Sequence, residues 1–309
     1  MSISRSSADY IAGRRLGDAG ITIISEGTLQ WAPKILAPED EVLRAIPELA
    51  DNGRVTLGLN LAHVALGEAS ILIDPGFDDP SSSWQGRLVE KWPGMRRSPG
   101  LDAGLAEIGV DPARVTHVLI THAHADHFAG VTIEQGGRDS VRFPNARHFI
   151  GRWDWEQSPA RQDPASDLTV RLGMIDRAGL LDLVDGERVV APGVTMIPAP
   201  GETPGHCVVH VRTGRDSFFY VGDLFHHPCE VEHPDWIPAG RDLAASRASR
   251  NRVYTDAAAA RADPTLIRDP LPIMLPSEFA ARRHNAAPGW KSIVAEDDGR
   301  PGDRHVCAR

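Results

Sequence analysis

Cysteines are few in this chain, and basic residues are fewer than acidic ones. The three cysteines, Cys207, Cys229 and Cys307, are an odd number at irregular spacing. This pattern excludes a disulfide framework and a cysteine-rich zinc finger, and it favours a reducing compartment. Lys and Arg number 33 against 42 Asp and Glu, so the formal net charge is −9. A charge of this sign argues against an electrostatic partnership with nucleic acid.

Long apolar runs are missing too. The sequence contains no stretch of about 18 consecutive apolar residues, so no transmembrane helix is expected. The first fifteen residues, MSISRSSADYIAGRR, lack the apolar segment of a secretory signal. We therefore expect a cytoplasmic protein without a membrane partner.

The composition that remains is that of an ordinary globular protein, with 41% hydrophobic and 24% charged residues. Short apolar strands occur in both halves of the chain, and helical patterns lie between them. The expected strands are Ile21–Ser25, two strands within 55–77 joined by a Gly-Glu turn, Val115–Ile120, His148–Ile150, Arg188–Val190, Val194–Pro198, Val208–Arg212, Ser217–Val221 and Pro272–Leu275. Helices are expected at Pro38–Asp51, Gly100–Gly109, within 151–169 and at Asp256–Arg261.

This order of elements predicts an α/β fold in which two sheets are sandwiched by helices. A single domain is expected over residues 1–309, with the first ~50 residues as an extension packed on it and residues ~290–309 as a tail.

The densest cluster of polar side chains is T-H-A-H-A-D-H at residues 121–127, directly after an expected strand. His122 and His124 are two residues apart on an extended segment, so both side chains point the same way and can hold one ion. Asp126 and His127 follow where the chain turns and can face a second ion. Imidazole and carboxylate are ligands that zinc accepts, and the end of a strand is a rigid place for them. The sequence therefore predicts a metal site.

The segment His122–His127 resembles the H-x-H-x-D-H signature of the metallo-β-lactamase superfamily. Three further motifs occur in the family's order, and the resemblance covers roughly residues 55–290. They are Leu72-Ile73-Asp74-Pro75-Gly76, Thr203-Pro204-Gly205-His206, which ends 79 residues after His127, and Val221-Gly222-Asp223, which ends 17 residues later. The resemblance implies an αββα sandwich, with two mixed sheets packed face to face and the metals at one edge.

Residue by residue, the resemblance assigns His122, His124 and His206 to a first divalent ion. Asp126 and His127 are assigned to a second ion, and Asp223 bridges both. Zinc is the first expectation for the two ions, with Mn²⁺, Fe²⁺ or Co²⁺ as alternatives. A hydroxide between two such cations is ionised near neutral pH and can act as a nucleophile, and Asp126 can take up or relay its proton.

The sequence departs from the family's pattern at two places. Glu278 stands where the family has a histidine that completes the second metal site. Glu278 as ligand, His284 in its place, or an incomplete second site are the three interpretations that remain. Glu202 replaces the first histidine of a P-G-H-x-P-G-H motif, and it is expected to support the site rather than to bind metal. His210, on the following strand, is expected to have no role in the site.

The segment Gly222–Trp236 resembles the lactonase-like and organophosphate-hydrolase-like branch of the superfamily. In that branch the residue at the position of His226 often donates a hydrogen bond to the substrate carbonyl, and a histidine can stabilise a developing oxyanion in this way. Lactonases tend to carry a bulky residue where Ala125 stands. Five tryptophans in expected loops are assigned to packing rather than to the site: Trp31, Trp84, Trp92, Trp153 and Trp155.

The function expected from this resemblance is that of a metal-dependent hydrolase. Its metal-bridging hydroxide would attack the carbonyl of a lactone or another ester, as in acyl-homoserine lactonases. The alternatives are phosphotriester or β-lactam hydrolysis at the same site, and a non-catalytic metal-binding relative. The partner is expected to be a small-molecule substrate, and a homodimer is the default expectation for the assembly.

Overall fold

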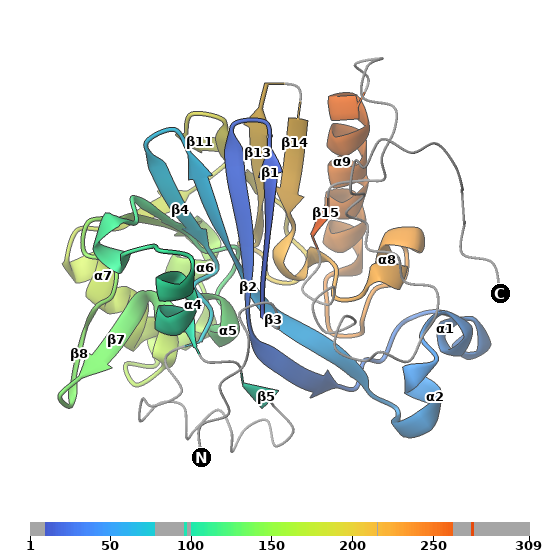
Figure 1. Ribbon diagram of the computed structural model, residues 1–309. Helices are drawn as coiled ribbons and strands as arrows, with labels where there is room; N and C mark the ends of the chain where they lie inside the picture. The colour runs from blue at the N-terminus through green and yellow to red at the C-terminus, as the bar shows by residue number, and fades with distance from the viewer. Residues whose placement is uncertain (1–9, 78–95, 98–99, 215, 262–272, 275–309) are drawn as a thin grey trace.

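The computed structural model describes residues 10–77, 96–97, 100–214, 216–261 and 273–274. Two β-sheets lie face to face, and helices cover both outer faces (Figure 1). In the larger sheet the strand order is β1-β2-β3-β4-β6-β9-β10, and β5 pairs with β2 at the side. The order in the smaller sheet is β11-β12-β13-β14-β15. The expected αββα sandwich is therefore confirmed.

The bounds of the elements are as follows. The strands of the larger sheet are β1 (Ile11–Leu16), β2 (Ala19–Trp31), β3 (Val55–Leu66), β4 (Ala69–Ile73), β5 (Arg96–Arg97), β6 (His117–Leu119), β9 (Arg147–Gly151) and β10 (Leu181–Val184). Those of the smaller sheet are β11 (Arg188–Ala191), β12 (Val194–Pro198), β13 (Cys207–Thr213), β14 (Asp216–Tyr220) and β15 (Ile273–Met274). A separate hairpin pairs β7 (Thr132–Gln135) with β8 (Arg138–Val141).

The helices are mostly short. They are α1 (Glu39–Ala45), α2 (Glu48–Asn52), α4 (Leu101–Glu107), α5 (Ala125–Phe128), α6 (Arg152–Glu156), α7 (Gly173–Arg177), α8 (Pro228–Glu232) and α9 (Leu243–Arg261). Short 3₁₀ helices lie at Pro112–Arg114, Ala129–Val131, Pro159–Gln162 and Gly222–Leu224, and a π-helical turn lies at Leu168–Leu172.

Side-chain alternation along the central strands explains why two sheets and two helical layers form. On β4, Ile71 and Ile73 pack into the core between the sheets, whereas Leu72 packs against the outer helices. On β14, Phe218 enters the core between the sheets and Phe219 packs on the other face, with Val253 of α9. Because successive strand residues point to opposite faces, an apolar strand without alternation is buried on both sides.

Helix α9 is much longer than the expected helix Asp256–Arg261, which covers only its last turns. Asp242 precedes it, and its Oδ1 accepts a hydrogen bond from the N–H of Ala245 at 3.0 Å, as an N-cap does. The buried positions of the helix include Ser246, Ser249 and Arg250. This buried face is partly polar, so the sequence shows no apolar stripe there.

Other expectations need smaller corrections. Trp31 ends β2, and Trp153 and Trp155 lie in α6, so these three tryptophans are not in loops. Trp84 and Trp92 lie outside the described residues. The expected strand Ile21–Ser25 is part of the much longer β2, and the other expected strands are found within a few residues of their bounds. The chain turns between β3 and β4 at Gly67, whose φ is +58°. Strands β1, β5, β7, β8 and β10 were not expected from the sequence.

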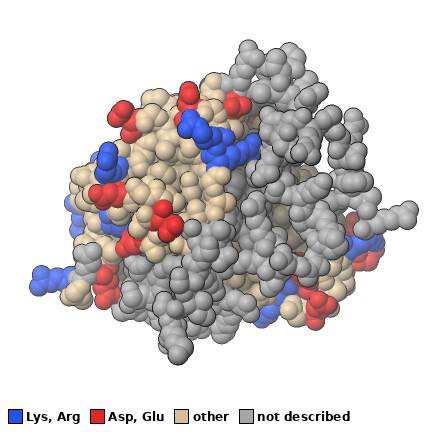
Figure 2. All heavy atoms as spheres, in the orientation of Figure 1, with Lys and Arg blue, Asp and Glu red and all other residues tan. Residues whose placement is uncertain are grey.

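Acidic and basic side chains are interspersed over the described part of the face shown in Figure 2. Within the described residues, no helix combines the length and the apolarity needed to cross a bilayer.

Candidate metal centre

The H-x-H-x-D-H segment lies where β6 ends, beside the end of its parallel neighbour β4. Asp74 follows β4 with a φ of +51°, in the left-handed region that Asp and Asn tolerate better than most residues. Its Oδ1 accepts a hydrogen bond from the N–H of Thr121 at 2.7 Å, and its Oδ2 accepts one from the Thr121 hydroxyl at 2.8 Å. This fully buried carboxylate fixes the start of the histidine segment.

Asp154, from α6, joins the histidine segment to the second loop of the site. Its Oδ2 accepts hydrogen bonds from the N–H of Ala123 at 2.8 Å and from the hydroxyl of Thr203 at 2.7 Å. Its Oδ1 accepts from the N–H of Gly205 at 2.9 Å. Asp154 thereby sets the distance between the loop that carries His122 and the loop that carries His206.

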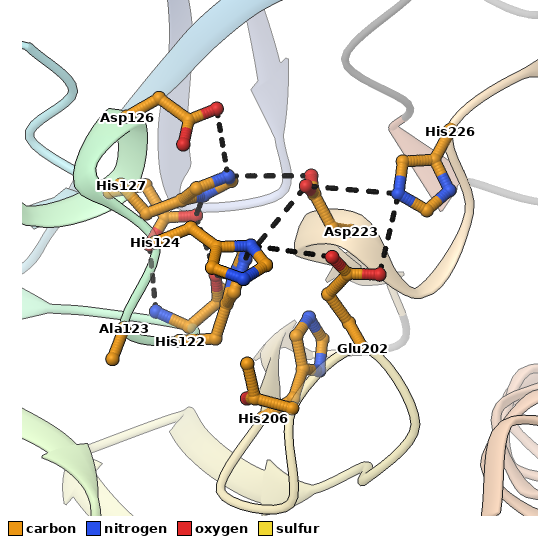
Figure 3. Close-up of polar contacts among 12 residues, drawn as sticks. His122, Ala123, His124, Asp126, His127, Glu202, His206, Asp223 and His226 are labelled. Atoms are coloured by element: carbon orange, nitrogen blue, oxygen red, sulfur yellow. Dashed lines mark hydrogen bonds and ion pairs between the residues drawn. The ribbon is translucent and has the colours of Figure 1, made fainter. Parts of the chain in front are cut away.

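Two sets of metal-ligand side chains meet at Asp223 (Figure 3). The first consists of His122, His124, Glu202 and Asp223, and the second consists of Asp126, His127 and Asp223; within each set the ligand atoms all lie within 4.8 Å of one another. The Nε2 of His127 is 3.4 Å from Asp223 Oδ1, and the Nε2 of His122 is 3.8 Å from Asp223 Oδ2. The two oxygens of one carboxylate therefore face the two sets.

His206 lies beside the first set. Its ring centroid is 5.1 Å from that of His122, and its Nδ1 is 3.1 Å from the carbonyl oxygen of Ala199. Its Nε2 is buried and has no hydrogen-bond partner in the described part of the chain. Gly222 allows this approach, since a Cβ there would lie 2.8 Å from the same Nε2.

These donors fit divalent metal ions. Buried polar atoms normally have hydrogen-bond partners, and the orphaned Nε2 of His206 is therefore accounted for if it ligates a cation. Imidazoles combined with carboxylates are donors that Zn²⁺, Mn²⁺, Fe²⁺ and Co²⁺ all accept. The Nδ1 of His127 contacts Asp74 Oδ2 at 2.8 Å, so its Nε2 is the nitrogen that faces the site.

Burial and mutual charge set the protonation of these groups. Burial lowers the pKa of His122, and His127 and His124 lower it further, which favours a neutral ring. Burial also lowers the pKa of His127, but Asp223, Asp126 and Asp74 outweigh that effect and raise it well above its ordinary value. Burial raises the pKa of Asp223, yet His127 outweighs burial and holds it well below its ordinary value. The carboxylate shared by both sets is therefore ionised.

His226 lies next to Asp223 and between two buried glutamates. Its Nε2 is 3.5 Å from Glu202 Oε2 and 3.8 Å from Asp223 Oδ2, and its Nδ1 is 3.7 Å from Glu230 Oε1. Burial lowers its pKa, but Glu202 and Glu230 outweigh burial and raise it to about 10. The ring of Trp31 is 4.8 Å from the His226 ring and tilted by 32°.

Each glutamate beside His226 pairs with an arginine. Arg241 Nε pairs with Oε2 of Glu202, and Arg250 pairs with Oε2 of Glu230. Arg250 also donates to the carbonyl oxygens of Leu224 at 2.9 Å and of Trp236 at 2.9 Å. These contacts tie the segment around His226 to α9.

A pocket adjoins the second ligand set. Part of its lining consists of Asp126, His127, Asp223 and His226, and a second wall comes from β2 and β3. That second wall is mainly apolar and consists of Leu29, Leu57, Gly58, Leu59 and Asn60. The pocket therefore combines polar groups at one side with an apolar surface at the other, as small-molecule sites do.

The structure brings together seven of the eight residues selected from the sequence: His122, His124, Asp126, His127, His206, Asp223 and His226. Glu278 and its alternative His284 lie outside the described residues. Glu202 was expected to support the site rather than to bind metal, and the structure places its carboxylate beside His122, His124 and Asp223. Asp154 was missed altogether, because a single aspartate in a helix gives no signal until the fold places it between two loops.

Two curated relatives illustrate what this chain is similar to in sequence. N-acyl homoserine lactonase AttM of Azorhizobium caulinodans is 32% identical over 141 residues, which are 43% of this chain and 50% of that protein. The probable metallo-hydrolase Rv2300c of Mycobacterium tuberculosis is 26% identical over 186 residues, 54% of this chain and 57% of that one. The chain thus spans about half the length of the curated relatives it matches.

Solved structures share the fold. A probable metal-dependent hydrolase from Staphylococcus aureus matches with a TM-score of 0.68 and 20% identity, over 80% of this chain and 88% of that one. AidC, a dizinc quorum-quenching lactonase in complex with a product, matches with a TM-score of 0.61 and 22% identity, over 82% and 88%. The family model of the metallo-beta-lactamase superfamily matches residues 61–265, about two thirds of the sequence. The chain belongs to the metallo-β-lactamase superfamily.

Proposed function

We propose that this protein is a metal-dependent hydrolase that binds two divalent ions and opens a lactone, with an N-acyl homoserine lactone as the first substrate to test. The observation that carries the proposal is the position of Asp223, whose two oxygens face two separate sets of ligands. The lactonase AttM, similar over less than half of this chain, supports the choice of substrate.

The proposed first site consists of His122, His124 and His206, and the proposed second site consists of Asp126 and His127, with Asp223 shared by both. Two bound cations would supply an ionised water nucleophile near neutral pH and a Lewis acid for the carbonyl. Zinc is the first metal to test, and Mn²⁺ the second.

The remaining steps fall to side chains that line the pocket. Asp126 Oδ2 is 3.5 Å from His127 Nε2, and its side chain is 17% exposed. A carboxylate at this place can take up the proton of the attacking water and return it to the leaving alkoxide. His226 lines the same pocket, and its N–H can donate to the developing oxyanion.

The apolar wall of the pocket suits an acyl chain. Leu29 of β2 and Leu57 and Leu59 of β3 line the same pocket as Asp126, His127 and Asp223. A lactone whose carbonyl lies at the polar side would place an acyl substituent along these leucines, where burial stabilises it by about 25 cal/mol for each Å² of apolar surface.

Proton release in a pH-stat tests the proposal directly. The protein loaded with Zn²⁺ or Mn²⁺ is mixed with an N-acyl homoserine lactone, and Asp126→Asn is the inactive comparison. We expect release of one proton per lactone opened, and a loss of at least about 100-fold in rate for Asp126→Asn. Asp163→Asn is a matched control, because Asp163 accepts a backbone hydrogen bond at an exposed turn.

Absence of proton release from protein with confirmed bound metal would reject the lactonase assignment. A phosphotriester and a β-lactam would be assayed on the same preparation. Turnover of either compound would keep the assignment as a hydrolase and change the assigned substrate. Turnover of neither would reject the assignment as an enzyme and favour a non-catalytic metal-binding protein.

A further inference from the structure

Glu202 has two oxygens in different surroundings. Its side chain is 1% exposed, although a carboxylate is costly to bury. Oε2 pairs with Arg241 Nε and lies 3.5 Å from His226 Nε2. Oε1 points the other way, toward the histidine segment, and lies 3.3 Å from His124 Nδ1 (Figure 3). The arginine therefore accounts for one oxygen only.

Oε1 accepts no hydrogen bond from any described residue, and it is buried. A buried carboxylate oxygen without a donor destabilises a protein unless another group satisfies it. The neighbouring His124 Nδ1 does not serve as that donor, because it already lies 2.8 Å from His122 Nε2. Two imidazole nitrogens and one carboxylate oxygen thus converge on the same small volume.

A divalent cation satisfies all three atoms at once. Their separations are those of ligands around a common centre, since the ligand atoms of His122, His124, Glu202 and Asp223 lie within 4.8 Å of one another. We propose that Glu202 is a ligand of the first metal through Oε1, while Arg241 holds Oε2 and offsets the cost of burying the carboxylate. This inference rests on the proposed function only in requiring a metal at the first site.

The chemistry of the site changes with this ligand. A carboxylate added to imidazoles shifts preference toward harder cations such as Mn²⁺ and Fe²⁺. The same residue touches His226, so metal occupancy of the first site and the position of His226 are linked through one side chain.

Glu230 provides the matched control. It is the other buried carboxylate beside His226, and its Oε2 likewise pairs with an arginine, Arg250. It belongs to neither ligand set. If Glu202 served only to position His226, Glu202→Gln and Glu230→Gln would have the same effect on metal binding.

Metal affinity and the visible spectrum of bound Co²⁺ separate these cases without any substrate. Apo-protein is titrated with Zn²⁺ and with Mn²⁺ against a chromophoric chelator, and the absorption of the Co²⁺-loaded protein is recorded. We expect Glu202→Gln to weaken binding of one metal equivalent at least about tenfold, more for Mn²⁺ than for Zn²⁺, and to alter the Co²⁺ absorption. Glu230→Gln should leave both measurements at their wild-type values.

Equal affinities and equal Co²⁺ spectra for wild type and Glu202→Gln would overturn the proposal. Circular dichroism shows whether Glu202→Gln is folded. If it is not, Glu202→Asp replaces it, because the shorter side chain keeps the charge for Arg241 and still withdraws Oε1. Lactone turnover by the wild type is measured separately, so this inference can fail while the proposed activity stands, and the reverse also holds.

Discussion

The N–H of Ala123, in the loop that follows β6, donates a 2.8 Å hydrogen bond to Asp154, which lies 31 residues further along the chain in α6. Asp154 accepts two further hydrogen bonds from Thr203 and Gly205. The two loops of the metal centre therefore take their separation from a side chain that lies in neither ligand set.

Asp154→Asn tests this arrangement. The amide has one acceptor oxygen for three donors, so at least one buried donor loses its partner, at a cost of about 1–3 kcal/mol in the free energy of unfolding. Metal affinity should fall as well, because both loops lose their anchor. Urea unfolding and metal titration measure the two effects. A variant with wild-type metal affinity would show that the loops hold their own positions.

Asp74→Asn tests the contact between Asp74 and His127. Asparagine tolerates the φ of +51° at this position, but it replaces the carboxylate that contacts His127 Nδ1 at 2.8 Å. Loss of a carboxylate that orients a ligating histidine typically lowers metal affinity about 10–100-fold. Asp74→Ala should add a backbone penalty of about 1–2 kcal/mol, seen as a further loss of stability in thermal unfolding.

Two glycine substitutions separate the effect of the close packing of Gly222 against Thr121 and His206 from the effect of its backbone conformation. Gly222 has a φ of +52°, and a Cβ there would lie 2.7 Å from Thr121 Oγ1 and 2.8 Å from His206 Nε2. Gly67 has a φ of +58° with nothing within 4 Å. Gly67→Ala should lower the free energy of unfolding only by the backbone strain of about 1–2 kcal/mol. Gly222→Ala should lower it by about 1–3 kcal/mol more and should also weaken metal binding. Equal losses would mean that the close approach is of no consequence.

His226 should act on turnover rather than on metal binding. If its N–H stabilises the oxyanion, His226→Phe lowers kcat about 10²–10³-fold and leaves metal content unchanged. His226→Gln, which retains a donor, should recover part of the rate. A loss of metal in both variants would assign His226 to the support of Asp223, which lies 3.8 Å away.

Stability should decrease in mild acid because of His148. Burial lowers the pKa of His148 to about 4, from an ordinary value of 6.5. Because the pKa of His148 is lower in the folded state than in the unfolded state, its contribution to the free energy of unfolding is complete above pH 6.5. That contribution is lost as the pH falls toward 4. Between pH 7 and pH 5 this single group should reduce the free energy of unfolding by about 2 kcal/mol.

The comparison of wild type with His148→Asn isolates that contribution. Asparagine can still donate to the carbonyl oxygen of Ala146, which contacts His148 Nδ1 at 3.1 Å. Urea unfolding at pH 7 and pH 5 should show a smaller difference for the variant than for the wild type. An identical difference would assign the acid sensitivity to other groups.

The sequence predicted the fold and most of the residues that the structure brings together at the candidate site, because both follow local rules. Apolar strands on both sides of a polar turn can be recognised in the amino-acid sequence, and the H-x-H-x-D-H spacing is a local pattern. The surroundings of Glu202 could not be predicted from the sequence, because they depend on where the fold places Arg241 and His124 beside its two oxygens. The start of α9 was missed because Arg250, a residue expected at the surface, is 1% exposed and hydrogen-bonded to carbonyls.

Strands β2 and β3 form a long antiparallel pair, and the two ends of the pair have different surroundings. Ile21 and Ile23 pack into the core between the sheets, and Leu29 lines the pocket further along the same strand. The register between the strands shifts between Ser25 and Gly27. Substitutions beyond that shift can reshape the pocket wall while the core half stays as it is. The pair of strands therefore separates the residues that shape the pocket from those that hold the sandwich together.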